Sequence, residues 1–514
     1  MKALVATLAL AAVAVLQSGC STLPPLEPRT PTTAITATQD TALGKAIAPR
    51  AAEHPGKAGV HALAQPTDAF AARILLAAAA QRTLDVQYYI WHGDETGYLM
   101  FEAAWQAAER GVRVRLLVDD NNTGGLDETL AALDAHPNLE VRLYNPLAIR
   151  GMRVLNYATD FTRVNRRMHN KSLTADNQAT IVGGRNIGNE YFGAGDATVF
   201  ADLDVLLVGP SVREVSGAFD LYWNSGSAYP AAALVGPPPA DARAWLQQRF
   251  AATRASPAAA AYIDAVKRTP LVTELLAGKL ALEWADARLV YDDPAKTLGK
   301  AERSELLITR LEQVIGKPQR ALDVVSPYFV PGETGTAAFA RIAREGVKVR
   351  VLTNSLAATD VAAVHAGYAK RRNELLASGI ELFELKPSAY AERVREAEGR
   401  KLGGSSSASL HAKTFSVDRE RVFVGSFNFD PRSAQLNTEM GLVIDSPTLA
   451  RGVSEGFDSL IPRFAYEVRQ DTGGLVWIER APDGEKRYTT EPETGAVRRG
   501  AVGVMSVLPI EWLL

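Results

Sequence analysis

The chain carries one five-residue pattern twice, and this duplication limits the possible folds more than any other feature of the sequence. Counted from His169 or from His411, a lysine stands two residues on, an aspartate seven, a glycine fourteen and an asparagine seventeen. Five residue types at equal spacing in two places lie far beyond chance in a chain of ordinary composition. We therefore expect two homologous halves that each bring one copy to a common site. The copies comprise His169, Lys171, Asp176, Gly183 and Asn186 in the first half, and His411, Lys413, Asp418, Gly425 and Asn428 in the second.

The sequence around the two copies repeats as well. Each half opens on a run of β-branched and aromatic residues, 82–90 in the first half and 320–329 in the second. A helical stretch then ends at a glycine, Gly111 or Gly346, and a further β-rich run follows. Strands that alternate with helices predict parallel or mixed sheets covered by helices. The predicted fold class is α/β, with two homologous α/β/α sandwich domains related by a pseudo-twofold axis and the active site at their interface.

Length and composition agree with such a two-domain protein. The chain has 514 residues, more than one ordinary domain, and 47% of them are hydrophobic and 22% charged, as in globular proteins. We expect a signal peptide over 1–20, a flexible Pro/Thr/Ala tether over 21–60, a first domain over 61–230, a linker region with helices over 231–300, a second domain over 301–470 and a C-terminal hairpin appendage over 471–514.

The N-terminal residues have the layout of a secretory signal. Met1 and Lys2 precede an unbroken run of small and apolar residues over 3–16, which is too short for a permanent membrane span. Small residues then lead to Cys20, the only cysteine of the chain. This arrangement resembles a bacterial lipobox, in which the cysteine is lipidated, although Gln17 stands at the position that prefers leucine. The alternative is an ordinary cleaved signal with a chance cysteine. Two or three acyl chains would anchor the protein stably.

The repeated histidines and lysines suit the chemistry of a phosphodiester. In a strand, His169 and Lys171 point to the same face, and so do His411 and Lys413. A neutral imidazole can attack phosphorus and form a phosphohistidine, while the second, protonated imidazole gives its proton to the departing alcohol. Because the lysines supply positive charge, this chemistry requires no metal and no other cofactor.

Further polar residues are expected around this centre. The phosphate oxygens should be bound by the lysines together with Asn186, Ser426 and Asn428. A catalytic imidazole also needs an acceptor for its other nitrogen. Asp202 and Glu439 each lie seven residues before the end of an apolar strand, so we assign them as the histidine-orienting acids, with Asp204 as an alternative to Asp202. For the motif residues Asp176 and Asp418 we expect buried structural roles, in which they bind loop amides.

The two motifs resemble those of the phospholipase D superfamily, and the similarity covers roughly residues 70–470. Within that superfamily, the string over 169–192 is similar to the cardiolipin synthase branch, and to its C-like lipoproteins in particular. One departure from the general pattern is Gly184, which stands where the second motif has Ser426. The first half therefore lacks one hydroxyl donor.

The resemblance implies phosphatidyl transfer between lipids. A donor phospholipid would lose its headgroup to give phosphatidyl-histidine, and phosphatidylglycerol would then attack to yield cardiolipin. By analogy with relatives, His169 would be the nucleophile and His411 the acid. The implied partners are membrane phospholipids, namely phosphatidylglycerol and, as a second candidate, phosphatidylethanolamine, together with the membrane surface. A lipidated protein of this kind would face the periplasm from one of the membranes of a bacterial envelope.

Competing functions use the same motifs. One is hydrolysis, by a phospholipase D or by a secreted phosphodiesterase or nuclease, and another is lipid binding without catalysis. A net charge of −2 gives no indication of nucleic-acid binding. The basic, serine-rich run over 393–409 is either a solvated loop or a segment that contacts lipid headgroups. Structural or surface roles are expected for the remaining histidines, His54, His61, His92, His136 and His365, and capping or histidine-orienting roles for Asp119 and Asp120.

Overall fold

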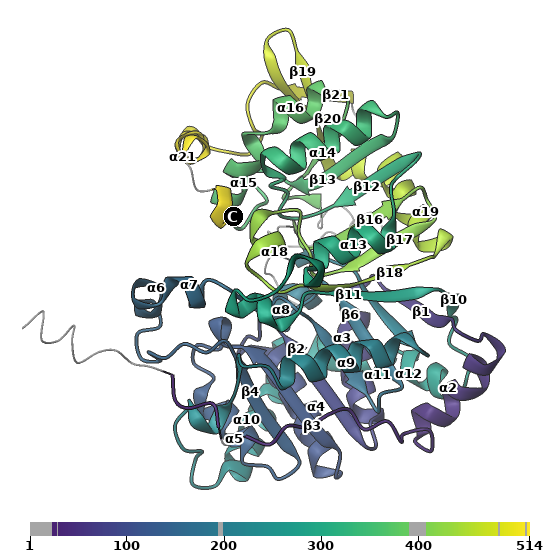
Figure 1. Ribbon diagram of the computed structural model, residues 1–514, viewed down its shortest axis with the longest axis vertical. Coiled ribbons are helices and arrows are strands. Elements are labelled where there is room, and N and C mark those ends of the chain that lie inside the picture. The colour runs from purple at the N-terminus through teal and green to yellow at the C-terminus, as the bar shows by residue number, and fades with distance from the viewer. Residues whose placement is uncertain (1–22, 28, 194–198, 390–407, 482–483, 509–510) are drawn as a thin grey trace, which may run out of the picture.

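Two large sheets form the body of the protein, one in each half (Figure 1). The computed structural model describes residues 23–27, 29–193, 199–389, 408–481, 484–508 and 511–514. The first sheet has nine strands in the order β10-β1-β8-β6-β5-β2-β3-β4-β9, and the second has ten in the order β11-β18-β17-β16-β12-β13-β14-β19-β20-β21. The predicted α/β class with two homologous domains is confirmed. The predicted signal peptide over 1–20, with Cys20, lies outside the described residues.

Both sheets are mixed, as the alternation of strands and helices predicts. In the first half β2, β3 and β4 pair in parallel, and β5, β6 and β8 continue the sheet antiparallel. The strands of the first sheet are β1 (Ala58–Leu63), β2 (Thr83–Tyr88), β3 (Arg113–Asp119), β4 (Leu139–Tyr144), β5 (Ser172–Ala175), β6 (Ala179–Gly183), β8 (Asp204–Val208), β9 (Ala228–Pro230) and β10 (Glu283–Ala285).

The second sheet repeats this topology. Its central strands β12, β13 and β14 pair in parallel, and β16, β17 and β18 follow antiparallel. The strands of the second sheet are β11 (Ala287–Tyr291), β12 (Ala321–Val325), β13 (Lys348–Asn354), β14 (Glu381–Leu385), β16 (Lys413–Val417), β17 (Arg421–Gly425), β18 (Met440–Ile444), β19 (Ala465–Asp471), β20 (Gly474–Ala481) and β21 (Gly484–Tyr488). A small third sheet joins β7 (Val199–Ala201) of the first half to β15 (Ala408–Leu410) of the second.

Helices pack on the sheets of both halves. Those of the first half are α2 (Ala42–Glu53), α3 (Pro66–Ala79), α4 (Glu95–Glu109), α5 (Asp127–Asp134), α6 (Leu155–Thr159), α7 (Phe161–Val164), α8 (Asn189–Phe192), α9 (Ser211–Trp223), α10 (Ala242–Ala255), α11 (Pro257–Arg268) and α12 (Leu271–Leu276). Those of the second are α13 (Leu307–Ile315), α14 (Gly332–Arg344), α15 (Ala362–Ala369), α16 (Arg372–Ala377), α18 (Pro431–Gln435), α19 (Pro447–Glu455), α20 (Ile461–Phe464) and α21 (Ala496–Val507). Within the described part of the chain, none of the helices combines the length and the apolar character that a membrane crossing demands.

The duplication extends to buried side chains. Asp85 of β2 accepts two hydrogen bonds from Arg115 of β3, at 2.7 and 2.8 Å. Asp323 of β12 accepts the same pair of bonds from Arg350 of β13, at 2.6 and 2.9 Å. A buried arginine requires a paired carboxylate, so each half retained both partners.

A separate hydrophobic core joins the halves. It contains Val60, Val182 and Leu207 from the first sheet, and Val424 and Leu442 from the second, all of them buried. Because this core removes apolar surface from water in the same way as a domain interior, it stabilises one arrangement of the two halves. That arrangement determines which side chains meet at the interface.

The boundaries predicted at the N-terminal side are wrong in one respect. The segment expected to be a tether over 21–60 is part of the first domain from Arg29 on, because the Arg29 side chain donates to Asn224 O, Ser225 O and Ala228 O. The Thr41 hydroxyl then caps α2, whose Leu43 is fully buried. The composition of this segment suggested a tether, but its few apolar residues are enough to pack one short helix.

The region over 231–300 is also more than a linker. Helices α10, α11 and α12 cover the first sheet and bury Leu246, Phe250 and Tyr262 in its core. Strand β10 then joins the first sheet and β11 joins the second. At the C-terminal side β20 and β21 form a hairpin, and β19 attaches it to β14 as an extension of the second sheet.

Candidate active site

The two repeated histidines lie where the halves meet, and each has its backbone held by the opposite half. His169 N donates to Thr438 O of the second half at 2.8 Å, and His411 N donates to Ala201 O of the first at 2.9 Å. His169 lies three residues before β5, and His411 lies between β15 and β16, rather than inside a strand as the sequence suggested. Both side chains are buried, with 7% of each residue exposed.

Each imidazole is also oriented by an acid from the other half. Glu439 lies 2.8 Å from His169 Nδ1 through Oε2, and Asp202 lies 2.6 Å from His411 Nδ1 through Oδ2. The sheet registers make these acids equivalent, because Gly183 pairs with Asp204, and Gly425 pairs with Gly441, two residues after each acid. The sequence located both acids but did not indicate that they cross the interface.

Asp204, the alternative acid, has a different role. Its carboxylate accepts from Arg73 at 2.9 Å and from Arg185 at 3.1 Å, and all three side chains are buried. Desolvation opposes the charge of Arg73, but the Asp204 carboxylate and the hydrogen bonds of the guanidinium raise its pKa above the ordinary arginine value. The alternative assignment was wrong because Asp204 is committed to these guanidinium groups.

The two lysines adjoin the histidines that precede them. Lys171 Nζ donates to His169 O, and Lys413 Nζ lies 3.1 Å from the ring nitrogens of His411. Burial lowers the pKa of Lys171 to about 7 and that of Lys413 to about 8, although nearby carboxylates oppose the effect. A negatively charged group bound beside these lysines would therefore favour their protonated, ammonium forms.

The pKa values of the two imidazoles and of their two orienting acids differ between the halves. Burial lowers the pKa of His411 to about 4, and it lowers the pKa of His169 well below the ordinary value, with Lys171 and Lys413 adding to the effect. Burial opposes ionisation of Asp202, but the hydrogen bond from His411 and the nearby cations outweigh it and bring its pKa to about 2. Burial raises the pKa of Glu439 to about 7. Asp202 is thus a full carboxylate at neutral pH, whereas Glu439 is close to its midpoint.

The motif aspartates bind loop amides, as expected. Asp176 accepts from the backbone of Gln81, Arg82 and Thr83, at 2.7 to 3.1 Å. In the second half Asp418 makes the same contacts, with Gln319, Arg320 and Ala321. Both aspartates occupy the left-handed region, with φ of 51° and 58°. Their hydrogen bonds attach the turn after β5 to the start of β2, and the turn after β16 to the start of β12.

The proposed phosphate ligands are less available than the sequence suggested. Asn186 accepts from Ile90 N at 3.1 Å and donates to Tyr191 OH at 3.0 Å. Ser426 donates its hydroxyl to Glu439 at 2.5 Å and accepts from Met440 N. Of the three, Asn428 differs, because its buried Oδ1 has no hydrogen-bond partner among the described residues. Ser426 and Asn186 therefore support other side chains of the site.

The departure at Gly184 has a steric reason. A Cβ atom at this position would lie 2.2 Å from Asp202 Oδ1, so any side chain there would displace the carboxylate that orients His411. Ser426 occupies the equivalent position in the second half and donates to Glu439. The first motif thus lacks this hydroxyl because the Asp202 carboxylate lies too close to the backbone of Gly184 to leave room for a side chain.

One residue fixes the chain just before each histidine; the sequence suggested a capping or histidine-orienting role for Asp119 and did not indicate Asn354. Asp119 accepts from Met168 N at 2.8 Å, and Asn354 accepts from Leu410 N at 2.8 Å. Both end a central strand, β3 or β13, and the parallel registers make them equivalent. Their position at the end of corresponding predicted strands was the signal that could have located them.

Aromatic rings complete the surroundings, since Tyr89 packs against His169, and Phe200 and Tyr191 pack against His411.

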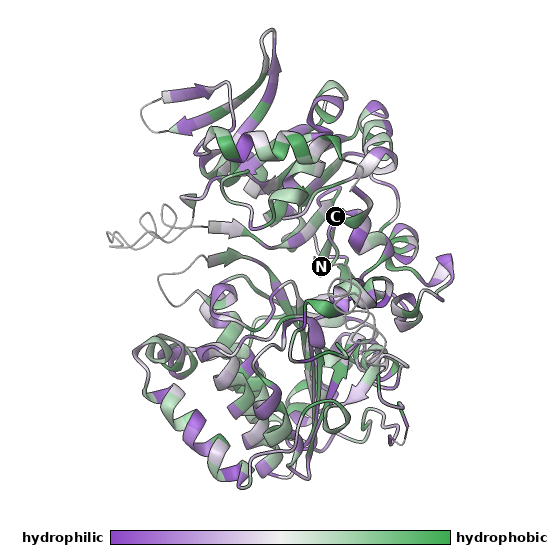
Figure 2. Ribbon diagram, turned by 90° about the vertical axis from the view of Figure 1, so that its left-hand side faces the viewer, coloured by the Kyte–Doolittle hydropathy of each residue, from purple (hydrophilic) through white to green (hydrophobic). Residues whose placement is uncertain are grey.

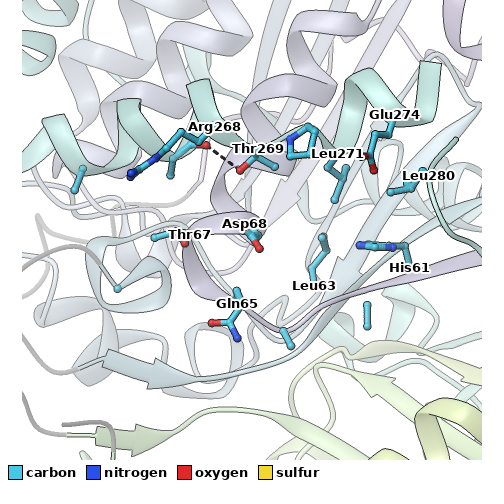
Figure 3. A pocket seen from close by; sticks show the side chains of 16 residues that line it. His61, Leu63, Gln65, Thr67, Asp68, Arg268, Thr269, Leu271, Glu274 and Leu280 are labelled. Atoms are coloured by element: carbon cyan, nitrogen blue, oxygen red, sulfur yellow. Dashed lines mark hydrogen bonds between the residues drawn. The ribbon is translucent and has the colours of Figure 1, made fainter. Parts of the chain in front are cut away.

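Two other features lie apart from the histidines. A cavity of about 560 Å³ is lined by residues of β1, α3, α11 and α12, including Asp68, Arg268 and Glu274 (Figure 3).

His92 and Glu190 are 3.2 Å apart, close to Asp94, in a group with the residue types of a metal site. Asp94 already caps α4 and accepts from Asn189 N. The basic run over 393–409 falls almost wholly on residues outside the described part.

Comparisons with known proteins find relatives over most of the chain. The family described as "Cardiolipin synthase, PLD-like domain" matches residues 74–213 and 311–461, one segment in each half. Cardiolipin synthase C of Escherichia coli (strain K12) is 48% identical over 473 residues, which cover 92% of this chain and 99% of that protein. Cardiolipin synthase B of Shigella flexneri is 25% identical over 391 residues, which cover 76% of this chain and 77% of that protein.

A solved structure shares the fold. The crystal structure of phosphatidylserine synthase from Haemophilus influenzae Rd KW20 matches with a TM-score of 0.56 and 14% sequence identity. The match covers 88% of this chain and 95% of that one. Both halves and their mutual arrangement therefore have a counterpart in a known structure.

Proposed function

The chain belongs to the cardiolipin synthase family with phospholipase-D-like domains, and from this membership we propose that it is a phosphatidyltransferase that makes cardiolipin. Phosphatidylglycerol and a second phospholipid are its substrates, and the reaction passes through a phosphatidyl-histidine intermediate. The observation that carries the proposal is the pair of imidazoles, each oriented by a carboxylate of the opposite half and adjoined by a buried lysine.

In the first step a histidine attacks the phosphorus atom of the donor lipid. Because Nδ1 of His169 is occupied by Glu439, its Nε2 is the nitrogen that is left to attack. The bond from phosphorus to the headgroup oxygen breaks, and His411 gives that oxygen a proton from its own Nε2. The product is phosphatidyl-His169 together with the free headgroup alcohol.

In the second step the acceptor lipid replaces the histidine. A hydroxyl of phosphatidylglycerol attacks phosphorus, His411 takes the hydroxyl proton, and the bond to His169 Nε2 breaks. Cardiolipin leaves, and both histidines return to their starting protonation states. The ammonium groups of Lys171 and Lys413 offset the charge that develops on the non-bridging oxygens in both steps.

The difference between the two acids supports this assignment of roles. Burial lowers the pKa of His411 to about 4, and the ionised Asp202 opposes that shift, so it favours the protonated state that a general acid needs. Burial keeps the pKa of Glu439 near neutral, so His169 faces a weaker negative charge and remains a neutral nucleophile. When His169 becomes a cationic phosphohistidine, its Nδ1–H can donate to the Glu439 carboxylate.

Lipid products separate this function from hydrolysis. The full chain is incubated with phosphatidylglycerol, with and without phosphatidylethanolamine, and the lipids are analysed by mass spectrometry. Cardiolipin is the expected product, and phosphatidylethanolamine increases its yield if that lipid is the preferred donor. Phosphatidic acid without cardiolipin would identify a phospholipase D instead.

Lipidation of Cys20 completes the proposal and places the enzyme at a periplasmic membrane surface. Replacing Cys20 with Ser removes the thiol that would carry the acyl chains. Activity on detergent-dispersed lipid should then persist, while cardiolipin made in cells falls, because a tether raises the local concentration of substrate. Membrane fractionation checks the result, and a Cys20→Ser protein that still sediments with membranes after a high-salt wash would contradict the need for the anchor.

A further inference from the structure

We propose that one side of the molecule is a bilayer-docking face, formed by residues 150–164 of the first half and by α21 with its C-cap residue Leu508 of the second. The occupant of this face is the surface of a phospholipid bilayer. The inference rests on the proposed function through the lipid anchor at Cys20, and it adds the orientation in which the enzyme meets its substrates.

Exposed apolar side chains concentrate in these two segments. The described residues include thirteen large hydrophobic side chains that are exposed, and eight of them belong to the docking face. In the first half Val154 is 73% exposed and Phe161 is 42% exposed, and on α21 Val497 reaches 88%. Apolar groups gathered in this way on an otherwise globular surface mark a contact with another apolar phase. The eight are Met152, Val154, Leu155, Phe161, Val497, Val504, Val507 and Leu508.

Basic side chains accompany the apolar ones. Arg150 and Arg153 of the first segment pair with Asp120 and Asp127, so these carboxylates offset their charge and hold the segment in place. On α21 Arg498 and Arg499 donate to neutral oxygens of Thr359 and Thr494, and neither forms an ion pair within the part of the chain that the structure describes. Arginine beside apolar side chains complements a bilayer surface that carries anionic lipids.

The length of the N-terminal tether directs the same side to the membrane. Arg29 is fixed to the first domain by three hydrogen bonds to residues 224–228. Arg29 follows Cys20 by nine positions, and an extended chain of that length spans at most about 30 Å. A lipid on Cys20 therefore keeps the side that carries Arg29 close to the bilayer. A free tether of forty residues, as the sequence suggested, would have left the orientation open.

The tether and the two apolar segments lie on one side. Asn145 joins the tether to the first apolar segment, because its backbone donates to Ser227 O beside the Arg29 contacts and its side chain donates to Arg163 O of α7. Figure 1 shows the start of the described chain, α6, α7 and α21 at the left of the molecule, and Figure 2 looks onto that side. Both halves of the protein thus contribute to one face.

The docking face also connects to the active site. Residues 150–164 lead into His169, and Asp120, which binds Arg150 and Arg153, follows directly on Asp119, which holds Met168. Tyr157 of α6 donates to Asn121 at 2.5 Å in the same cluster. A lipid taken from the docked bilayer would therefore meet the segment that precedes the nucleophile.

Site-specific fluorescence tests the proposed orientation. Once Cys20 is acylated, an introduced cysteine is the only free thiol in the chain. Leu155→Cys and Val504→Cys proteins, labelled with an environment-sensitive fluorophore, are bound to vesicles of phosphatidylglycerol and phosphatidylethanolamine that contain brominated lipid. Both labels should be quenched. A label at Leu276→Cys on α12, at the opposite side in Figure 1, serves as the control, because Leu276 is 37% exposed and Leu155 is 38% exposed.

The outcomes distinguish this inference from the proposed function. Quenching at Leu276 but not at Leu155 and Val504 would overturn the docking face, and so would protection of both labels by self-association in solution without lipid. A wild-type protein that itself takes up the thiol label would disprove acylation of Cys20, and the same three labels would then be compared in the Cys20→Ser background. Failure to make cardiolipin would contradict the proposed function without affecting the quenching.

Activity gives a second measurement. A variant with Met152, Val154, Leu155 and Phe161 all replaced by serine should lose about tenfold more activity on vesicles than in detergent micelles, because binding to an interface scales with the apolar area inserted. Leu276→Ser is the matched control and should lose the same fraction in both. If the quadruple variant lost the same fraction of its activity in vesicles and in micelles, the segment would only support the fold.

Discussion

The two halves repeat their backbone, their histidine and lysine, and the aspartate that locks the turn, but they surround the imidazoles differently. In the second half Glu439 is joined by the hydroxyls of Ser426 and Ser433. In the first half the shorter Asp202 approaches the backbone at Gly184, where no side chain fits. Since the acids cross the interface, the polar surroundings of the second half act on His169, and the closely packed carboxylate of the first half acts on His411.

This difference shows how a duplicated domain can produce two unequal catalytic groups. Two identical halves would give two imidazoles with equal pKa values and no preference for either role. A carboxylate with a pKa of about 2 beside one imidazole, and an acid with a pKa of about 7 beside the other, remove that equality. In the proposed mechanism, each half therefore determines the role of the histidine that belongs to the other half.

The largest effect is expected from the histidines themselves. His169→Asn and His411→Asn should each reduce kcat by about 10⁴-fold or more, because both histidines act in the same two-step transfer reaction. Only the His411→Asn protein should retain the phosphatidyl group, and it should carry that group on His169. Mapping the modified peptide after an alkaline quench, which preserves phosphohistidine, provides the measurement. A phosphatidyl group on His411 would reverse the two roles.

The crossed acids should differ in their contributions. Asp202→Asn should lower kcat by about 10³-fold, because it removes a full negative charge from the general acid. Glu439→Gln should cost only about tenfold, because glutamine resembles the protonated form that is half populated near neutral pH. Kinetics across pH checks the cause, since loss of the Asp202 charge lowers the pKa of His411 and moves the active range to lower pH. A greater loss for Glu439→Gln would refute the asymmetry.

The steric difference between the halves leads to a smaller effect. Gly184→Ala should reduce activity by about 100-fold, because its Cβ would displace Asp202 from His411. Ser426→Ala is the matched substitution in the other half. It removes one hydrogen bond to Glu439 and should cost about tenfold. Thermal unfolding of both variants serves as the control for general damage to the fold. Equal losses would argue against close packing at Gly184.

The buried lysines should limit activity on the alkaline side. Their pKa values of about 7 and 8 lie below the ordinary lysine value, so the protonated, active forms are lost as pH rises through this range. kcat/KM should therefore begin to fall at about pH 7. Lys171→Arg, which replaces the lysine with the lower pKa, retains its charge at all of these pH values and should shift the alkaline limb upward while lowering the maximum severalfold. An unchanged alkaline limb would show that another group controls it.

Much of the fold and the central site could be predicted because the relevant signals are local or repeated. The strands over 83–88 and 321–325 follow from β-branched runs, and the turn-locking role of Asp176 and Asp418 follows from their place in the motif. The tether and linker were misjudged because composition does not reveal which neighbouring surface a short helix such as α2 will cover. The commitment of Ser426 to Glu439 depends on an approach between strands that spacing does not specify.

The sequence by itself determined the duplication, the paired histidines and lysines, and the two acids, because equal spacing in two copies needs no knowledge of distant contacts. Only the tertiary structure decided which acid serves which histidine, why Gly184 replaces a serine, and which side bears the exposed apolar segments. These features arise where the two halves pack together through the core that contains Val60, Val424 and Leu442. That packing depends on the shape of both surfaces at once, and a pattern along one chain carries no information about it until the chain has folded.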